Sequence, residues 1–204
     1  MATVTPSRPP VFNLPNQLTA ARLILGLVLF VLISAGYWIA CIVVFALAAL
    51  TDWLDGYLAR KQGLTSTLGR NLDPLVDKVL ICGAYIFLLP LGTAGGWLVP
   101  WMVTVIVARE LIITSLRSFL ENRGATFGAD WLGKVKMGLQ CAALFAIFVF
   151  LHLDLDTPDT SQNAHWFFGT VRDGLVWAML AATALSGLQY LWRAALLLKT
   201  DVDT

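Results

Sequence analysis

Residues 37–93 read YWIACIVVFALAAL (37–50), TDWLDGYLARKQGLTSTLGRNLDPLVDK (51–78) and VLICGAYIFLLPLGT (79–93). Two apolar runs therefore flank a polar segment that carries four aspartates. An apolar run of about 20 residues is long enough to cross the hydrocarbon core of a bilayer as a helix. Because the polar segment is short, this stretch predicts two antiparallel membrane helices with the acids at their shared end.

The composition of the whole chain also indicates a membrane protein. The chain has 204 residues, of which 58% are hydrophobic and 13% are charged, and its mean hydropathy is +0.74. Soluble domains are about half apolar and about a quarter charged, so an ordinary soluble enzyme, a disordered chain and a disulfide scaffold are excluded. The net charge of +1 excludes the strongly basic footprint of a nucleic-acid-binding domain. Cys41, Cys82 and Cys141 lie within apolar runs without metal-ligand spacing, which predicts small core or lipid-facing residues.

Apolar runs recur along the chain. They cover about residues 20–36, 37–58, 75–93, 97–120, 131–153 and 174–198. We therefore expect an all-α, polytopic membrane protein with six transmembrane helices, in which residues 19–200 form one membrane domain. Residues 1–18 are expected to be a cytoplasmic or interfacial segment, and the mixture of apolar and polar residues at 11–16 favours a short N-terminal interfacial helix.

The basic residues predict the orientation. With six crossings, one side of the membrane receives both termini, the loop around 59–78 and the region 109–136. Of the 14 basic residues, all except Arg172 fall on that side. Since Lys and Arg accumulate in cytoplasmic loops, we expect a multi-pass protein of the cell (inner or cytoplasmic) membrane with both termini cytoplasmic. His152 and His165 then lie on the outer side, where ordinary surface residues are expected.

Helical geometry places the acids of residues 51–78 on shared faces. At about 100° of rotation per residue, five positions on the first helix fall within an arc of about 140°. They are Asp52, Asp55, Gly56, Ala59 and Arg60. On the next helix, Asp73 and Asp77 are one turn apart, and Gly69 precedes them by one turn. An ordinary solvated loop would show neither a shared face nor small residues between its acids.

This arrangement of acids predicts a metal site. Four carboxylates held together at low dielectric repel one another unless they are protonated or neutralised by cations. Oxygen donors favour Mg²⁺ or Mn²⁺, and four acids suit a two-metal site for phosphoryl displacement. Gly56, Ala59 and Gly69 leave room for a ligand near the backbone, and Arg60 supplies a forked donor for phosphate oxygens.

The spacing resembles the signature of the CDP-alcohol phosphotransferase superfamily, Asp-x2-Asp-Gly-x2-Ala-Arg-x8-Gly-x3-Asp-x3-Asp. The chain matches it at Asp52, Asp55, Gly56, Ala59, Arg60, Gly69, Asp73 and Asp77. The resemblance implies a six-helix membrane enzyme, usually a homodimer, that uses two divalent cations, Mg²⁺ or Mn²⁺. It implies that the metal ligands are Asp52, Asp55, Asp73 and Asp77, with Asp77 also the general base. It further implies that the cytidine diphosphate pocket is lined by Gly56, Ala59, Arg60 and Gly69.

Within the superfamily, residues 13–145 are similar to the phosphatidylglycerophosphate synthases. The similarity rests on Asn13–Thr19 followed by Arg22, on Ala108-Arg109-Glu110 and Arg117, and on Gly133-Lys134-Val135-Lys136 with Gln140. It implies transfer of the phosphatidyl group of CDP-diacylglycerol to glycerol 3-phosphate, a step of phospholipid biosynthesis. Met137 and Leu27 depart from these synthases, which usually have Thr and often Pro at the two positions.

Basic residues in the second half of the chain suit an acceptor that carries phosphate. Arg109 interrupts an apolar run and lies about 12 Å along its helix from Arg117, while Lys134 and Lys136 lie at the start of the next crossing. Because such groups bind phosphate oxygens, we expect Arg109, Arg117 and Lys134 to bind the acceptor phosphate. For Arg22 two roles stay open, a lipid-headgroup anchor and a structural partner.

Three alternatives stay open at the level of the sequence. A sister enzyme with the same signature would use inositol phosphate, serine or phosphatidylglycerol as its acceptor. An ion or proton transporter would also carry intramembrane acids, but it predicts internal repeats that the sequence does not show. A relative that only binds nucleotide is the third, although all four acids are present.

Overall fold

The computed structural model describes the backbone of residues 14–62, 67–121, 131–157 and 161–202. Side chains are described for residues 17–52, 75–120, 131–157 and 161–196. The α-helices are α1 (Leu14–Ala35), α2 (Trp38–Gln62), α3 (Thr67–Gly95), α4 (Pro100–Glu121), α5 (Trp131–Leu151) and α6 (Gln162–Val202). A short π-helix, η1 (His152–Asp156), continues α5. No strand occurs within these ranges, and the all-α prediction is confirmed for them.

Four of the described helices contain stretches that are long and apolar enough to cross a membrane. These stretches are Gln17–Ala35, Leu75–Gly95, Trp131–Asp156 and Gln162–Leu196. A shorter apolar stretch, Trp38–Asp52, lies in α2. The helix α4 is not among them, since Arg109, Glu110 and Arg117 interrupt its apolar sequence. The structure therefore has six helices at the six expected places and four candidate spans among the described residues.

Two boundaries differ from the expected ones. The predicted interfacial helix at 11–16 lies mostly outside the described residues, and α1 begins at Leu14. The helix α6 begins at Gln162, well before the expected start at about 174. The segment between 162 and 173 mixes polar and charged residues with the apolar run Trp166–Phe168, so it shows no continuous apolar run, but no proline interrupts it and the helix continues.

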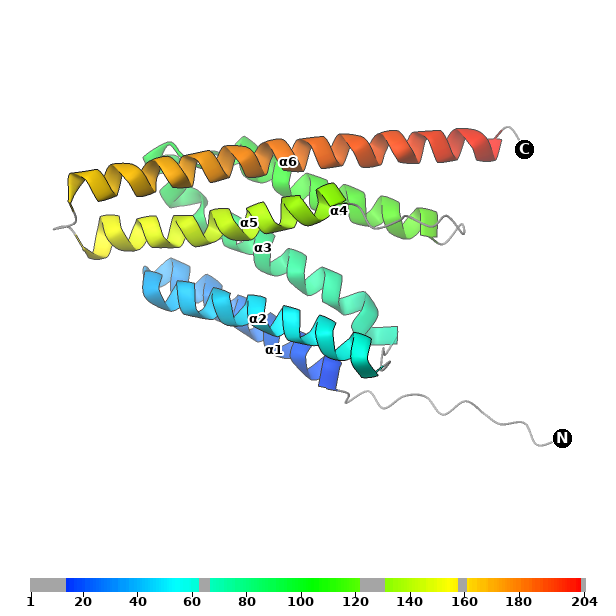
Figure 1. Cartoon of the computed structure of the whole chain (residues 1–204), viewed down its shortest axis with the longest axis horizontal. Coiled ribbons are helices and arrows are strands. Elements are labelled where there is room, and N and C mark those ends of the chain that lie inside the picture. The colour runs from blue at the N-terminus through cyan, green and yellow to red at the C-terminus, as the bar shows by residue number, and fades with distance from the viewer. Residues whose placement is uncertain (1–13, 63–66, 122–130, 158–160, 203–204) are drawn as a thin grey trace.

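The helices include two antiparallel pairs, which contact each other through α2 and α5 and are further connected by α3 (Figure 1). The first pair is α1 with α2, and the second is α5 with α6. The helix α3 packs on α1 and also contacts α4 and α5. The end of α2 and the start of α3 lie where α1 begins, and α4 and α6 end toward the same side (Figure 1). We call this side the signature end, because the motif between Asp52 and Asp77 runs through it.

A glycine allows the tight connection between α1 and α2. Gly36 has φ +75°, a left-handed conformation that glycine adopts without a steric penalty. The N–H of Tyr37 donates to the carbonyl oxygen of Leu32 at 3.1 Å, which closes α1 in the pattern common at helix C-termini. The short turn sets α2 beside α1 and so carries Asp52 back toward the signature end.

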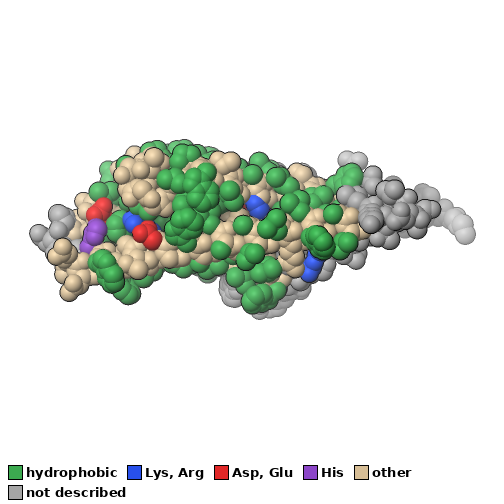
Figure 2. Space-filling view, turned by 90° about the horizontal axis from the view of Figure 1, so that it is seen from above, with side chains coloured by type: hydrophobic (Ala, Val, Ile, Leu, Met, Phe, Trp, Pro, Cys, Tyr) green, Lys and Arg blue, Asp and Glu red, His purple; other side chains and the backbone are tan. Residues whose placement is uncertain are grey.

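The surface of the protein is rich in apolar side chains. Figure 2 shows many hydrophobic side chains spread over the described part of one face, with few charged side chains among them. On α6, Leu188 is 65% exposed and Trp192 is 70% exposed. Large contiguous apolar surfaces are rare on soluble monomers and typical of contact with lipid. The surface thus agrees with a multi-pass membrane protein.

The end opposite the signature end carries ion pairs between histidines and acids. His152 Nδ1 lies 2.9 Å from Asp156 Oδ2, and His165 Nε2 lies 2.7 Å from Asp154 Oδ1. All four side chains are partly exposed. Arg172 is buried at this end, where it pairs with the adjacent Asp173. The first pair lies within η1, the second joins η1 to the start of α6, and both lie away from the predicted site.

Candidate active site

Two of the predicted metal ligands converge on one arginine. Asp52 lies on α2, Asp77 on α3 and Arg22 on α1. Arg22 Nη1 donates to Asp77 Oδ1 at 2.7 Å and lies 3.0 Å from Asp52 Oδ1. Since one nitrogen reaches both carboxylates, the two acids face each other across the junction of three helices. The predicted convergence of acids from adjoining helices is therefore present for this pair.

The other signature residues can be placed only along their helices. Asp55, Gly56, Ala59 and Arg60 belong to α2, which is helical to Gln62. Gly69 and Asp73 belong to α3, which begins at Thr67, so Asp73 precedes Asp77 by one helical turn. Their side chains lie outside the described residues, and the complete four-acid site stays a prediction. Where side chains are described, no group of three or more His, Cys, Asp or Glu residues could hold a metal ion.

The chemistry of Asp52 and Asp77 fits a hard divalent cation. Both supply carboxylate oxygens, and both already place an oxygen against one cationic nitrogen. Oxygen-only donors of this kind suit Mg²⁺ or Mn²⁺ better than softer metals. The two acids therefore meet the chemical requirement for part of a metal site.

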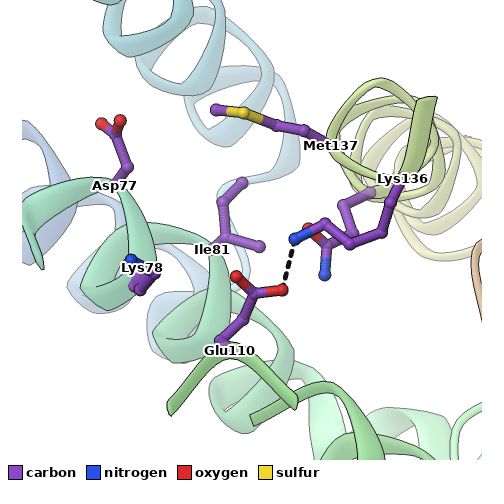
Figure 3. A pocket seen from close by; sticks show the side chains of 7 residues that line it. Asp77, Lys78, Ile81, Glu110, Lys136 and Met137 are labelled. Atoms are coloured by element: carbon purple, nitrogen blue, oxygen red, sulfur yellow. Dashed lines mark hydrogen bonds and ion pairs between the residues drawn. The ribbon is translucent and has the colours of Figure 1, made fainter. Parts of the chain in front are cut away.

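A cavity lies on the other side of Asp77. It has a volume of about 180 Å³ and lies between α3, α4 and α5. Its described lining residues are Asp77, Lys78, Ile81, Glu110, Lys136, Met137 and Gln140. In Figure 3, Asp77 and Lys78 come from α3, and a dashed line joins Lys136 of α5 to Glu110 of α4. We call it the lysine cavity. A smaller cavity of about 80 Å³ contains Arg22, Asp52 and Asp77, so Asp77 lines both spaces.

Charged groups in the lysine cavity are held by partners. Lys136 is 5% exposed and forms a hydrogen-bonded ion pair with Glu110, itself 6% exposed (Figure 3). Glu110 also accepts a hydrogen bond from Arg109 Nη1 at 3.2 Å. Charges in an apolar bundle require such partners because desolvation is costly. Gln140 is 2% exposed, and its side-chain nitrogen has no hydrogen-bond partner within the described part of the chain. That nitrogen is therefore a candidate donor to a ligand.

None of the predicted acceptor residues is among the described lining residues of the lysine cavity. Arg109 Nη2 donates to Ser186 Oγ on α6 at 3.0 Å. Arg117 donates to the Tyr190 hydroxyl, and its guanidinium lies 5.3 Å from the centre of the Tyr190 ring. Both arginines thus join α4 to α6. Lys134 is exposed on α5.

Sequence reasoning did not select Lys78; it noted Lys136 in the basic cluster and Gln140 in the family resemblance but assigned neither to the acceptor phosphate. A signal was available, since Lys136 and Gln140 are four residues apart in an otherwise apolar helix and share one face. Lys134, two residues before Lys136, must then point to nearly the opposite face. Arg109 and Arg117 contact residues of α6 that are more than 70 positions away in the sequence. These contacts could not be predicted from spacing, because they form only when α4 packs on α6.

Comparison with known proteins gives a family match and several similar relatives. The model of the CDP-alcohol phosphatidyltransferase family matches residues 12–188. Several relatives are named CDP-diacylglycerol–glycerol-3-phosphate 3-phosphatidyltransferase. The one from Bacillus subtilis (strain 168) is 35% identical over 181 residues, which cover 80% of this chain and 92% of the relative.

Relatives with the same name from two other bacteria have similar sequence identity to this chain. The protein of Pectobacterium atrosepticum is 37% identical over 141 residues, covering 67% of this chain and 76% of the relative. The protein of Escherichia coli (strain K12) is 37% identical over 138 residues, covering 65% and 75%. The family match extends over the helices that carry Arg22, Asp52, Asp77 and the lysine cavity. The chain therefore belongs to the CDP-alcohol phosphatidyltransferase family.

Proposed function

We propose that the protein transfers the phosphatidyl group of CDP-diacylglycerol to glycerol 3-phosphate, giving phosphatidylglycerophosphate and CMP. The observation that carries the proposal is the position of Asp77, which meets Asp52 at Arg22 and also lines the lysine cavity. One carboxylate thus adjoins both a space for a metal-bound diphosphate and a space for a phosphate-bearing acceptor. The printed names of the relatives support these two substrates.

The donor is held at the signature end. Two divalent cations, Mg²⁺ or Mn²⁺, when bound to Asp52, Asp55, Asp73 and Asp77, would neutralise the donor diphosphate and the charge that develops on CMP. The cytidine diphosphate lies against Gly56, Ala59, Arg60 and Gly69, where small residues admit the nucleotide. The acyl chains stay in the lipid beside the apolar surface.

Asp77 acts as the general base. It accepts the proton of the attacking hydroxyl of glycerol 3-phosphate, whose oxygen forms a bond to the β-phosphorus of the donor. The bond between that phosphorus and the bridging oxygen breaks, and CMP leaves. A single displacement of this kind needs no nucleophile from the protein.

The acceptor occupies the lysine cavity. Lys78 and Lys136 bind its phosphate, and Arg109, Arg117 and Lys134 supply further positive charge around it. The Gln140 amide donates to an acceptor oxygen, which satisfies a buried donor. The cavity volume of about 180 Å³ is below the range of about 300–1,000 Å³ for drug-sized ligands, and this favours a small acceptor over a second phospholipid.

We also infer where the enzyme works and in what form. It is a multi-pass protein of the cell membrane with both termini and the active site on the cytoplasmic side, as the distribution of basic residues supports. It functions as a homodimer, as the resemblance to its superfamily implies.

An acceptor assay tests the proposal. Purified protein is incubated with CDP-diacylglycerol and Mg²⁺ or Mn²⁺, together with glycerol 3-phosphate, inositol phosphate, serine or phosphatidylglycerol in separate reactions. CMP release and the lipid product are measured in each. Glycerol 3-phosphate is expected to give the highest kcat/KM and phosphatidylglycerophosphate as product. A lipid product from one of the other alcohols alone would assign a sister activity, and ion transport without CMP release would refute an enzyme.

A further inference from the structure

Arg22 lies outside the signature motif but contacts two of its acids. We propose that Arg22 is a positioning residue that fixes Asp52 and Asp77 relative to each other and thereby raises the affinity of the site for divalent cations. The inference rests on the proposed metal-dependent function. It assigns a role in the site to α1, a helix that carries no residue of the signature.

The location of Arg22 supports a role inside the protein. Its exposed fraction is 2%, and it shares the cavity of about 80 Å³ with Phe45 and Leu80 as well as the two acids. A lipid-headgroup anchor near a helix end would be exposed at the membrane interface. The burial of Arg22 therefore excludes this role and leaves the inward contacts to be explained.

The contacts of Arg22 tie three helices together at one atom. Nη1 lies 2.7 Å from Asp77 Oδ1 on α3 and 3.0 Å from Asp52 Oδ1 on α2. Any displacement of α2 from α3 at this level must break at least one of these contacts. Arg22 therefore holds the carboxylates of two separate helices in a fixed relation before a cation arrives.

A carboxylate can serve Arg22 and a metal at the same time. Each acid has two oxygens, so the one bonded to Arg22 and the one bonded to a cation can differ. Partners that hold metal ligands in orientation affect metal affinity by about 10–100-fold. The positive charge of Arg22 also reduces the repulsion between the acids, which would otherwise separate α2 and α3.

The test measures Mn²⁺ binding to the metal-free protein in detergent by the electron paramagnetic resonance signal of free Mn²⁺. Arg22→Gln is expected to raise the Kd for Mn²⁺ by about 10–100-fold. The matched control is Arg172→Gln, which removes another buried arginine paired with an aspartate, at the opposite end. Its Kd is expected to equal that of the wild type. The midpoint of thermal unfolding, with and without Mn²⁺, is recorded for each protein.

The outcomes separate the inference from the function on which it rests. A wild-type protein that binds no Mn²⁺ overturns the metal-dependent function. If the wild type binds Mn²⁺ and Arg22→Gln binds it equally well or more tightly, Arg22 does not raise the metal affinity and the inference is overturned while the function stands. Should Arg22→Gln fail to fold, Arg22→Lys carries the test. The lysine side chain is shorter and ends in one ammonium group, so it is expected to contact only one of the two acids. We therefore expect the Kd for Mn²⁺ to rise by about threefold or more. An unchanged Kd would overturn the inference.

Discussion

Asp77 is the residue at which the two halves of the proposed reaction meet. It contacts Arg22 on one side, and on the other it lines the lysine cavity with Lys136. A general base must lie within hydrogen-bond reach of the hydroxyl that it deprotonates, and only a residue between donor and acceptor can do so. Asp77 would meet this requirement with the acceptor in the lysine cavity, as proposed, because it lines that cavity and the one that holds Arg22.

Asp77→Asn is expected to remove the proton acceptor while keeping the shape of the side chain. Because general-base catalysis contributes about 10²–10⁴-fold, kcat should fall by at least that factor. CMP release at saturating substrates measures the change. Asp173→Asn, at the opposite end, is the control and should keep wild-type turnover. Normal turnover of Asp77→Asn would remove Asp77 from the role of base.

Arg109→Ala should chiefly affect the acceptor. Arg109 lies beside Glu110 and bonds to Ser186, so it contributes positive charge next to the lysine cavity without contacting the donor. The KM for glycerol 3-phosphate is expected to rise by about tenfold or more, whereas the KM for CDP-diacylglycerol should stay unchanged. Steady-state kinetics with each substrate varied in turn would show it. Equal changes in both KM values would argue against an acceptor role.

The buried pair of Lys136 and Glu110 makes a prediction about stability. Lys136→Met should destabilise the protein by about 3 kcal/mol, the lower end of the range for breaking a buried ion pair, because Arg109 still partners Glu110. The double variant Lys136→Met with Glu110→Gln should regain part of this loss. Denaturation in mild detergent measures both. A double variant less stable than the single one would show that Glu110 is stabilised mainly by Arg109.

At the scale of the helices, close packing between α1 and α3 sets the position of Arg22. A Cβ atom at Gly83 on α3 would lie 2.2 Å from Cζ of Phe30 on α1, too close for the ring to remain in place. The ring of Phe30 also stacks on Phe87, with centroids 5.0 Å apart. Glycine at position 83 therefore allows the approach that brings Arg22 to Asp77.

Gly83→Ala is expected to separate α1 from α3 and to cost about 1–3 kcal/mol of stability, as overpacking of a core usually does. Gly174→Ala on α6 is the control, since an added Cβ there has no heavy atom within 4 Å. It should be neutral or slightly stabilising, because alanine favours a helix over glycine. Thermal unfolding compares the two. A Gly83→Ala protein as stable as the control would show that Phe30 repacks freely.

The helices were largely predictable from the sequence, since apolar runs bounded by glycine and charged segments indicate membrane helices. The start of α6 was not predictable in this way, because polar and charged residues alternate with apolar ones in its first three turns and leave no continuous apolar run. The meeting of Asp52 and Asp77 followed from helical spacing. The links from Arg109 to Ser186 and from Arg117 to Tyr190 did not, because they arise only when α4 packs on α6.

At the scale of the whole molecule, divalent cations should stabilise the signature end. Removal of metal with excess EDTA is expected to abolish CMP release and to lower the midpoint of thermal unfolding, since the carboxylates then repel one another. Added Mg²⁺ or Mn²⁺ should restore both. The chelated protein and the reconstituted protein are assayed side by side. Full activity after thorough chelation would contradict a metal-dependent transfer.

Because α6 is longer than a bilayer is thick, the thickness of the bilayer can affect the shape of the lysine cavity. The helix has 41 residues and, at about 1.5 Å per residue, extends for about 60 Å, whereas the hydrocarbon layer is about 30 Å thick. The helix must therefore tilt or extend into the headgroup region, where the exposed Arg193 would contact lipid headgroups. Arg109 and Arg117 of α4 are hydrogen-bonded to α6. A thinner or thicker bilayer that changes the tilt of α6 is therefore expected to displace α4 as well. Glu110 of α4 lines the lysine cavity, so the shape of that cavity would change with the thickness of the bilayer.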